Sequence, residues 1–279
     1  MNGSEESVSP SRESEIALPA RGRCEGVCNV FRFNWPLYAV GFAASAGAFA
    51  LAMFFPHPRW LAGAFLAGSA AAAYLLIASL VVSLWIYDLS PLYRFQWVHS
   101  AAGPEPRRIL NFHSGFDESS LALRRSFNAA QLEVMDFYDG RTMTEPSILR
   151  ARHHQDRFRP AALTAITRSV ATAALPIDDQ SIDAAFAILA AHEIRRPDER
   201  LQFFREIARG LRAGGRLVLV EHLRNTANFM AFGPQFVHFY SRGTWLQLAR
   251  DAGFTLVEES RITPFIGLFI FQKAGSQKP

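Results

Sequence analysis

Two long stretches near the N-terminus contain no formally charged residue. They cover residues 33–58 and 60–87, and only Arg59 lies between them, in a turn that contains two prolines. Each stretch is longer than the roughly 20 apolar residues that a helix needs to cross about 30 Å of hydrocarbon. We therefore expect a hairpin of two transmembrane helices, at about residues 36–56 and 60–86. The alternative is a helical hairpin buried inside a soluble protein.

The residues that flank these stretches predict an orientation. Aromatic side chains that suit a membrane–water interface gather at the ends of both stretches. Arginines precede the first stretch and follow the second, whereas the turn contains only one. Because positive charge favours the cytoplasmic side, we expect an integral protein of the cytoplasmic membrane with both termini and the rest of the chain in the cytosol. These residues are Trp35, Tyr38, Trp60, Trp85, Tyr87, Tyr93 and Trp97 among the aromatics, and Arg21, Arg23, Arg32, Arg94, Arg107 and Arg108 among the arginines.

Beyond residue 107, short apolar runs alternate with helical patterns. In residues 198–211 the side chains of Leu201, Phe204 and Ile207 recur at helical spacing. Residues 216–221 contain Leu-Val-Leu-Val, which is typical of a strand buried on both faces. The alternation predicts an α/β, Rossmann-like, seven-stranded and mostly parallel sheet with helices on both faces and a final antiparallel strand. The expected strands are 108–112, 132–136, 163–172, 182–189, 216–221, 254–259 and 265–272, and the expected helices are 119–127, 147–155, 198–211 and 244–252.

Composition and charge limit the classes of function. Hydrophobic residues make up 49% and charged residues 19% of the 279 residues, which excludes disorder of the whole chain. The net charge is +4, but the basic residues form no run, so we expect no nucleic-acid partner. Cys24 and Cys28 are too few for a disulfide scaffold or a multi-cysteine zinc site. We interpret them as reduced thiols, with metal binding or acylation as the alternative, and predict no metal site.

The same patterns divide the chain into segments. Residues 1–35 are polar and lack periodicity, which predicts a disordered cytosolic tail without a secretory signal. The hairpin follows. We then expect a linker at 88–106, an α/β domain at 107–273 and a short tail at 274–279.

Two segments of the α/β region resemble a known family. Residues 174–183, which read Ala-Leu-Pro-Ile-Asp-Asp-Gln-Ser-Ile-Asp, look like the stretch before the fourth strand of class I S-adenosylmethionine-dependent methyltransferases. Residues 204–221 resemble the helix, glycine turn and fifth strand of the same family, in its type 11 form. The resemblance implies a methyltransferase fold, S-adenosylmethionine as the cofactor and transfer of a methyl group.

The resemblance also places a donor-binding turn after the first strand. In the family this strand ends in an acidic residue and a glycine-rich turn follows, which lets the backbone approach the ligand. Here residues 111–117 read Asn-Phe-His-Ser-Gly-Phe-Asp. Gly115 matches a glycine of the family, whereas Asn111 stands in place of the acid, and His113 and Asp117 stand in place of glycines. The cradle for the donor therefore contains bulkier side chains than the family pattern.

Other positions of the implied donor site lie further along the chain. Asp136 ends the second strand, where a carboxylate accepts hydrogen bonds from both ribose hydroxyls. Ala171 and Thr172 lie where the family holds adenine, but no acidic side chain is present there, and Ala190 follows the fourth strand. If S-adenosylmethionine binds at these positions, we expect a cavity that reaches the carboxylate of Asp136.

Three histidines are candidate bases for the acceptor. His192 follows the fourth strand and His222 follows the fifth, and sites in open parallel sheets lie at those strand ends. His238 precedes the last helix. His192 and Glu193 form no metalloprotease motif. For each histidine the alternative is a surface or capping role.

Two hypotheses on function remain open at this point. We favour a membrane-anchored methyltransferase that acts on a small-molecule or lipid-like acceptor, which is hydrophobic or resident in the bilayer. The apolar insertion at residues 224–234 then either rests on lipid, admits such an acceptor, or forms a lid packed on its own domain. The alternative is a degenerate methyltransferase fold that has lost the donor and serves as a membrane-tethered binding module.

Overall fold

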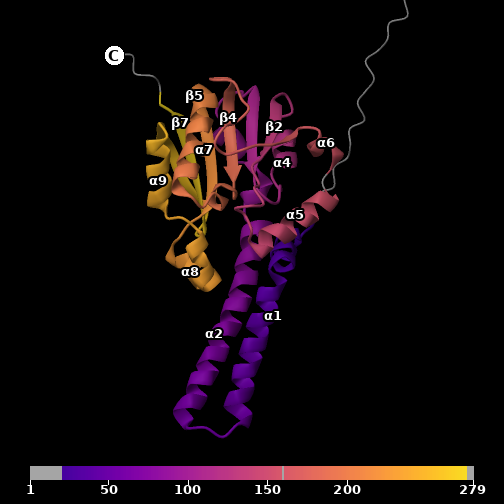
Figure 1. Ribbon diagram of the computed structural model, residues 1–279, viewed down its shortest axis with the longest axis vertical. Helices are drawn as coiled ribbons and strands as arrows, with labels where there is room; N and C mark the ends of the chain where they lie inside the picture. The colour runs from indigo at the N-terminus through magenta and orange to yellow at the C-terminus, as the bar shows by residue number, and fades with distance from the viewer. Residues whose placement is uncertain (1–20, 159, 275–279) are drawn as a thin grey trace, which may run out of the picture.

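A two-helix hairpin projects from one edge of an α/β unit in the computed structural model, which describes residues 21–158 and 160–274 (Figure 1). Most of the predicted N-terminal tail and of the C-terminal tail lies outside these residues. The helices are α1 (Glu25–Phe54), α2 (Arg59–Leu84), α3 (Val98–Ala102), α4 (Ser120–Ser126), α5 (Pro146–Phe158), α6 (Ala161–Thr164), α7 (Pro197–Gly210), α8 (Thr226–Phe232) and α9 (Arg242–Asp251). The strands are β1 (Arg108–His113), β2 (Gln131–Asp136), β3 (Thr167–Ser169), β4 (Ile182–Ile188), β5 (Leu211–His222), β6 (Phe254–Thr263) and β7 (Ile266–Lys273).

The strands form one seven-stranded sheet in the order β3-β2-β1-β4-β5-β7-β6. The first five pair in parallel, and β7 pairs antiparallel with both β5 and β6. The predicted mostly parallel sheet with a final antiparallel strand is therefore confirmed. The parallel strands point their carboxyl ends toward the hairpin (Figure 1). In an open parallel sheet this is the edge at which ligands bind.

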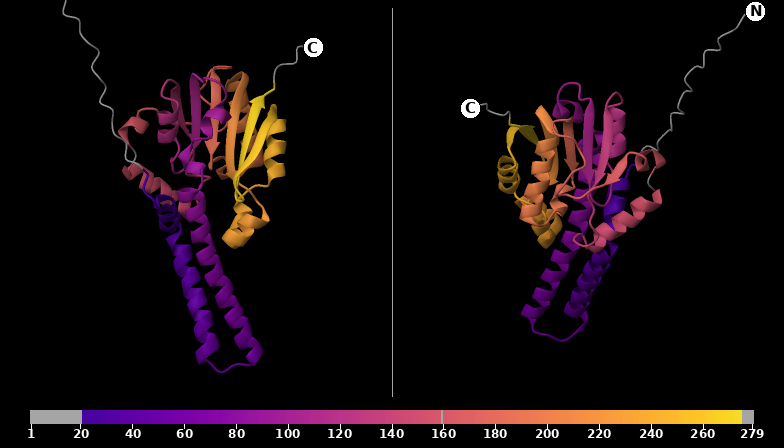
Figure 2. Two further views of the ribbon diagram at one scale, coloured as in Figure 1. Left: turned by 180° about the vertical axis from the view of Figure 1, so that it is seen from behind. Right: turned by 45° about the horizontal axis from the view of Figure 1, so that its top comes forward.

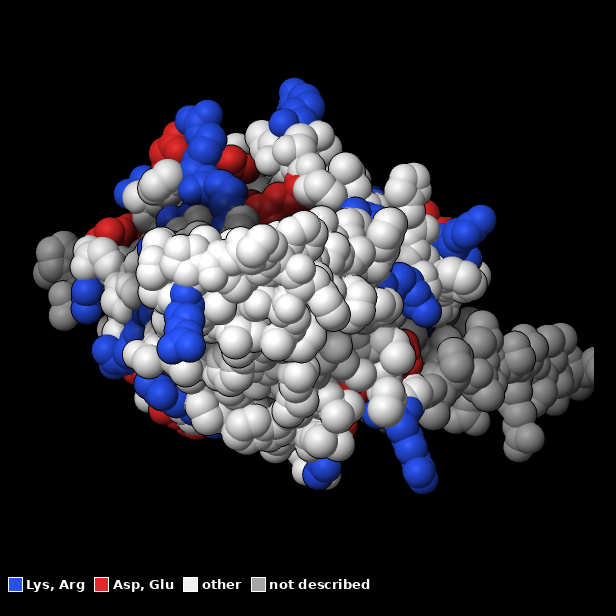
Figure 3. Space-filling view, turned by 90° about the horizontal axis from the view of Figure 1, so that it is seen from below, with Lys and Arg blue, Asp and Glu red and all other residues white. Residues whose placement is uncertain are grey.

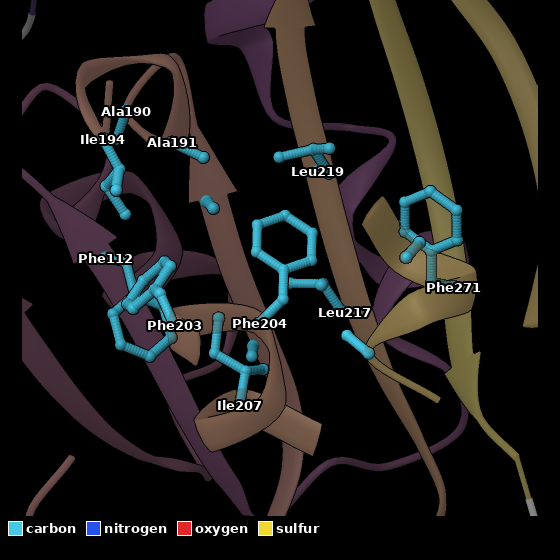
Figure 4. Packing of buried hydrophobic residues seen from close by; sticks show 14 of the residues in the cluster. Phe112, Ala190, Ala191, Ile194, Phe203, Phe204, Ile207, Leu217, Leu219 and Phe271 are labelled. Atoms are coloured by element: carbon cyan, nitrogen blue, oxygen red, sulfur yellow. The ribbon is translucent and has the colours of Figure 1, made fainter. Parts of the chain in front are cut away.

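Helices cover both faces of the sheet, as the alternating pattern predicts. On one face α7 presents Phe203, Phe204 and Ile207 to the apolar side chains of β5, including Leu217 and Leu219 (Figure 4). The helix α9 lies beside α7 on this face (Figure 1). The buried aromatic and aliphatic side chains exclude water and fix the strands on which the site is built.

The opposite face is covered in part by the segment that we expected to be a linker. Leu92, Val98 and Ala101 are fully buried and belong to the same apolar cluster as Ile109 and Phe186 of the sheet. A mobile linker would leave such side chains in water. The prediction of a linker at residues 88–106 is therefore wrong for its middle part, because its apolar residues complete the second face.

The first helix begins earlier than predicted, inside the stretch assigned to the polar tail. Glu25 starts α1, and the carboxylate of Asp88 accepts hydrogen bonds from the backbone N–H groups of Gly26 and Val27 at 2.8 Å each. These N–H groups have no partner within the helix, so a carboxylate there stabilises its first turn. Asp88 lies in the π-helical turn that follows α2, so the two helices are joined at the end near the sheet.

The hairpin carries apolar side chains on its outer surface. Phe42, Phe54 and Trp60 are each at least 70% exposed. Both helices are long and apolar enough to cross a membrane, judged by length and composition, and almost nothing of their most apolar windows is buried. Seen along the hairpin, a broad area without charged side chains fills the centre of the view, and most of the Lys and Arg side chains lie around its rim (Figure 3).

Two shorter helices lie where the hairpin meets the α/β unit. The helix α8 lies beside α2, and α5 crosses near the upper part of α1 in both orientations (Figures 1 and 2). Arg150 of α5 donates a hydrogen bond to the backbone carbonyl of Phe33 in α1, and the ring of His154 lies 5.7 Å from the ring of Phe33. The hairpin is thus bound to the edge of the sheet through side chains as well as through the chain itself.

Candidate functional site

A cavity of about 630 Å³ lies between the hairpin and the carboxyl edge of the sheet. Its sheet side is formed by residues that follow three neighbouring strands: His113 to Gly115 after β1, Ala190 after β4, and His222 at the end of β5. Its other wall comes from α1, α2 and the turn that contains Tyr87. The volume falls within the roughly 300–1,000 Å³ of small-molecule sites.

The turn after β1 reaches this cavity through some of the predicted donor residues only. His113 and Gly115 line it, but Asn111 and Asp117 do not. Asn111 is fully buried, and its amide donates hydrogen bonds to the hydroxyls of Ser119 and Ser120 at 2.8 and 2.7 Å. Asp117 accepts hydrogen bonds from the backbone N–H groups of the same two serines. Both side chains therefore fix the start of α4, and their prediction as donor contacts is not met in this arrangement.

The helix α5 covers Gly115 and Asp136, the two residues that best match the donor site of the family. A Cβ on Gly115 would lie 2.7 Å from Cγ1 of Ile148, so this glycine allows close approach of α5. Asp136 is only 2% exposed, and its carboxylate accepts a hydrogen bond from the guanidinium of Arg152 at 2.5 Å. Because Ile148 and Arg152 are four residues apart, they lie on one face of the helix.

The expectation of a cavity that reaches Asp136 is therefore wrong. Asp136 does not line the cavity, because the arginine on α5 occupies the position where ribose hydroxyls were expected. At the predicted adenine position Ala171 is exposed, and Thr172 donates a hydrogen bond to Glu199 at 2.6 Å. Of Ala171, Thr172 and Ala190, the expected donor residues that follow Asp136 in the chain, only Ala190 lines the cavity.

His192 is held by carboxylates on both sides of its ring. Its Nδ1 lies 2.7 Å from Oε2 of Glu221, which is fully buried, and its Nε2 lies 3.3 Å from Oε1 of Glu193. Burial alone would lower the pKa of His192, but the negative charge of Glu221 and the hydrogen bonds of both carboxylates raise this pKa to about 10. At neutral pH His192 is thus an imidazolium, so the prediction that it serves as a base does not fit its surroundings.

His222, unlike His192, is uncharged at neutral pH. Burial, aided by the positive charge of His192, lowers the pKa of His222 to about 3, so its ring is neutral at pH 7. The amide of Asn228 donates to the carbonyls of Leu223 and Phe265 at 2.8 Å each, which turns its oxygen toward Nδ1 of His222 at 3.2 Å. Nδ1 therefore carries the proton.

The remaining ring nitrogen of His222 faces the cavity wall. Nε2 lies 2.8 Å from the hydroxyl oxygen of Tyr87, and both residues line the cavity. With the proton on Nδ1, this nitrogen accepts the hydrogen bond that Tyr87 donates. His222 therefore lies at the cavity as a neutral imidazole whose Nε2 is already occupied by the hydroxyl of Tyr87, and its role as a base stays a prediction.

His238 lies outside the cavity. Its side chain is 48% exposed, and its Nδ1 lies 3.0 Å from the guanidinium of Arg195 and 3.3 Å from Glu145. This is the surface role that was the alternative for each histidine. Its neighbour Phe239 faces the cavity instead and stacks on the ring of His222, with the ring centres 4.5 Å apart.

Several residues of the site carry no recognisable signal in the sequence. Tyr87 was expected as a membrane anchor, and Arg152 had no expected role in the site. Glu118 is held by the hydroxyl of Tyr93 at 2.8 Å and by Arg21 at 2.9 Å, and burial raises its pKa. Only Glu221 had a detectable signal, because it is an acidic residue at the end of an otherwise apolar strand.

Comparison with known proteins adds a family match for the sheet unit. Residues 130–219, from the start of the second strand to the fifth, match the family described as "Methyltransferase domain". This match identifies residues 130–219 as part of a class I methyltransferase domain. No curated protein sequence matches the chain.

Solved structures with similar folds include three methyltransferases. A SAM-dependent methyltransferase from Aquifex aeolicus has 16% identity and a TM-score of 0.49, and the match covers 67% of this chain and 94% of that one. One from Methanosarcina mazei has 18% identity and a TM-score of 0.44, covering 64% and 97%. The geranyl diphosphate C-methyltransferase from Streptomyces coelicolor has 13% identity and a TM-score of 0.45, covering 70% and 83%.

The methyltransferase domain implies S-adenosylmethionine as its cofactor. In the arrangement described here, the residues fit only part of this molecule. The turn at residues 113–115 and Ala190 face the cavity and can hold one end of it. Asp136 cannot receive the ribose, because it is buried under Arg152. The nucleoside end can bind at Asp136 only where this ion pair has opened.

Proposed function

We propose that this protein is a membrane-anchored, S-adenosylmethionine-dependent methyltransferase that acts on a hydrophobic or membrane-resident acceptor. The observation that carries the proposal is the cavity, which is shared between the carboxyl edge of a methyltransferase sheet and an apolar helical hairpin. An acceptor in this cavity contacts the sheet edge at one end and the hairpin at the other.

The exposed apolar surface of the hairpin supports the proposal that it anchors the protein in a membrane. A helix pair in the core of a soluble protein is mostly buried, whereas the apolar side chains of α1 and α2 are mostly exposed. Exposing this much apolar surface to water is unfavourable, and a bilayer removes that cost. The arginines that flank the hairpin support a position of the methyltransferase domain at the cytoplasmic surface.

The histidine pair supports a division of roles at the acceptor. The bound cofactor supplies an electrophilic methyl group. His222 is neutral and accepts the hydrogen bond of the Tyr87 hydroxyl, which leaves the oxygen lone pairs of Tyr87 to accept a hydrogen bond from an acceptor hydroxyl or amine and so orient it. His192, as an imidazolium fixed by Glu221, favours negative charge that develops on the acceptor.

Methyl transfer can be tested directly. The full chain, reconstituted in phosphatidylcholine nanodiscs, is incubated with methyl-labelled S-adenosylmethionine and a lipid extract of bacterial membranes. We expect label in the organic phase, and loss of most of that label in Asp136→Ala and in His222→Gln. A folded protein that transfers no label to any fraction would contradict the proposal.

The alternative, a tethered binding module without methyl transfer, is favoured by one observation. The Asp136–Arg152 ion pair closes the ribose position and satisfies a buried carboxylate without any ligand. If this alternative holds, Asp136→Ala keeps the cellular function of the protein, provided that the variant still folds. Loss of function in a folded Asp136→Ala protein supports the enzyme instead.

A further inference from the structure

The cavity has two chemically different ends. Between the two long helices it is lined by Leu37, Gly41, Ala72 and Leu76. At the sheet edge it is lined by polar and titratable side chains: Tyr87, Tyr93, His113, Ser114, Glu118, His192, Glu193 and His222. A ligand that fills it must therefore be apolar along one part and able to form hydrogen bonds at the other.

The apolar end lies within the uncharged part of the hairpin. Leu37 and Val40 line the cavity, yet they are 48% and 67% exposed, so this end is open toward the surroundings of the helices. Gly41 lets Leu76 of α2 pack closely on α1, since a Cβ at this position would lie 2.8 Å from Cδ2 of Leu76, and the small side chain of Ala72 lines the cavity beside them. An alkyl chain that lies in the bilayer can therefore enter sideways without crossing a charged residue.

The polar end selects against anionic head groups. Among the described residues that line the cavity there is no lysine and no arginine. The imidazolium of His192 lines the cavity, but it is already paired with the carboxylates of Glu221 and Glu193. The carboxylate of Glu118 is likewise paired with Arg21, so a phosphate group would lie beside these carboxylates and would have to compete with them for their cations, which disfavours it.

An uncharged hydroxyl fits the same groups. It can donate a hydrogen bond to a carboxylate such as Glu193 or to the hydroxyl oxygen of Tyr87, whose own proton is held by His222. The cavity volume of about 630 Å³ is that of a site for one molecule of moderate size. A head of this kind on a single tail uses both ends of the cavity and leaves no buried charge unpaired.

We propose that this cavity binds a single-tailed amphiphile with an uncharged, hydroxyl-bearing head, and that it excludes lipids with a phosphate head. The tail lies between α1 and α2, and the head lies at His192 and His222. The inference rests on the proposed function for the role of this molecule as the methyl acceptor. Binding itself requires no methyl transfer and is measured without the cofactor.

The test uses an alkylphenol as the probe. The full chain in phosphatidylcholine nanodiscs is photolabelled with a phenol whose dodecyl tail carries a diazirine, and the labelled residues are mapped by mass spectrometry. We expect labels on cavity-lining residues of α1 and α2, and competition by 4-dodecylphenol but not by dodecyl phosphate. Ala72→Phe fills the apolar end, so it should lower labelling about tenfold, whereas Ala71→Phe, on an exposed position outside the cavity, should not.

A second variant tests the head group independently of helix packing. Glu193→Lys places a cation at the polar end and should allow dodecyl phosphate to compete. Equal competition by both compounds in the unchanged protein, or labelling that Ala72→Phe leaves intact, overturns the inference. Binding of S-adenosylmethionine, measured separately, shows whether the proposed function fails together with it or stands alone.

Discussion

At the scale of single residues, the site is governed by pairs that lie far apart in the chain. Asp136 and Arg152 form one such pair, and His192 and Glu221 form another. Each partner changes what the other can do: the arginine occupies a carboxylate that would otherwise face a ribose, and the carboxylate converts a histidine from a base into a cation. The chemistry of the cavity therefore follows from these contacts more than from the residue types alone.

The first pair predicts the effect of Arg152 on donor affinity. S-adenosylhomocysteine must displace this guanidinium before its ribose can reach Asp136. Replacing a charge-assisted hydrogen bond in this way costs about 1.5–3 kcal/mol, so Arg152→Gln should bind the ligand about tenfold more tightly. Calorimetry on the full chain in nanodiscs measures the difference.

Arg141→Gln is the control, since Arg141 is largely exposed and pairs only with Asp139 at the surface. Unchanged or weaker binding of S-adenosylhomocysteine by Arg152→Gln would contradict the prediction.

The histidines predict how stability depends on pH. The folded protein keeps a proton on His192 between about pH 6.5 and 10, whereas the unfolded chain has released it, so this contribution to stability falls as the pH rises through that range. Between about pH 6.5 and 3 the unfolded chain binds a proton that His222 excludes, so stability also falls as the pH decreases. Chemical denaturation of the solubilised protein measures both slopes. Glu221→Gln should flatten the alkaline slope, and His222→Asn the acidic one; if neither variant changes the profile, the assigned protonation states are wrong.

At the scale of secondary-structure elements, the position of α5 and the start of α1 decide the shape of the site. Ile148 and Arg152 lie on one face of α5 and together cover Gly115 and Asp136. The same helix is held against α1 through Arg150. Movement of α5 away from the sheet edge would expose the donor position and alter a contact with the hairpin at the same time.

The junction of the hairpin also predicts a local effect on stability. Asp88 caps the first turn of α1, and removal of a capping carboxylate costs about 1 kcal/mol. Asp88→Ala should therefore raise amide hydrogen exchange in residues 26–33 about fivefold. Asp139→Ala, which removes a carboxylate that pairs with an exposed arginine, should leave this exchange unchanged. Equal exchange in Asp88→Ala and the unchanged protein would show that the cap does not hold this turn.

The sequence alone predicts those helices and strands whose apolar pattern lies within one short stretch of the chain. The apolar run of β5 and the facing side chains of α7 fix a strand and a helix that need no distant partner to be recognised. The start of α1 could not be found in this way, because its cap, Asp88, lies about sixty residues away and stands next to an apolar stretch. Residues 92–102 were assigned to a linker although most of them are apolar, because this short stretch shows no regular period, and only the finished sheet shows what they cover.

The site was less accessible from sequence than the fold. The residues His113, Gly115, Ala190, His192 and His222 do meet at one cavity, because the ends of parallel strands meet at one edge. The protonation of His192, however, depends on Glu221, and the closure of Asp136 depends on Arg152, which lies on a helix sixteen residues further along the chain. Neither contact leaves a pattern in the chain that would indicate it.

At the scale of the whole molecule, the account joins a methyltransferase domain to an apolar hairpin through one shared cavity. The carboxyl edge of the sheet faces the hairpin, so an acceptor that enters from a bilayer arrives at the edge where the cofactor binds (Figure 1). Seen from below, the area around the hairpin is largely free of charged side chains (Figure 3). Under the proposed function, a molecule would be methylated in this arrangement without leaving the membrane.

The arrangement predicts a topology that thiol labelling can check. Cys24 and Cys28 are exposed at the sheet end of α1, so a membrane-impermeant maleimide should label them only after intact cells are permeabilised. A cysteine at position 57, made by His57→Cys in a variant whose two native cysteines are serines, should be labelled from outside. The opposite pattern would invert the orientation, and labelling of neither position in intact cells together with a soluble protein would remove the anchor.

The central claim is that this domain still binds the methyl donor, and its dissociation constant for S-adenosylmethionine tests that claim most directly. Calorimetry on the folded full chain in phosphatidylcholine nanodiscs should give a value between about 1 μM and 1 mM, the range typical of enzyme substrates. Asp136→Asn, which keeps the size of the side chain but removes its charge, should weaken binding by about tenfold or more. No heat of binding at millimolar donor, in protein shown to be folded, would contradict the account and leave a tethered fold without methyl chemistry.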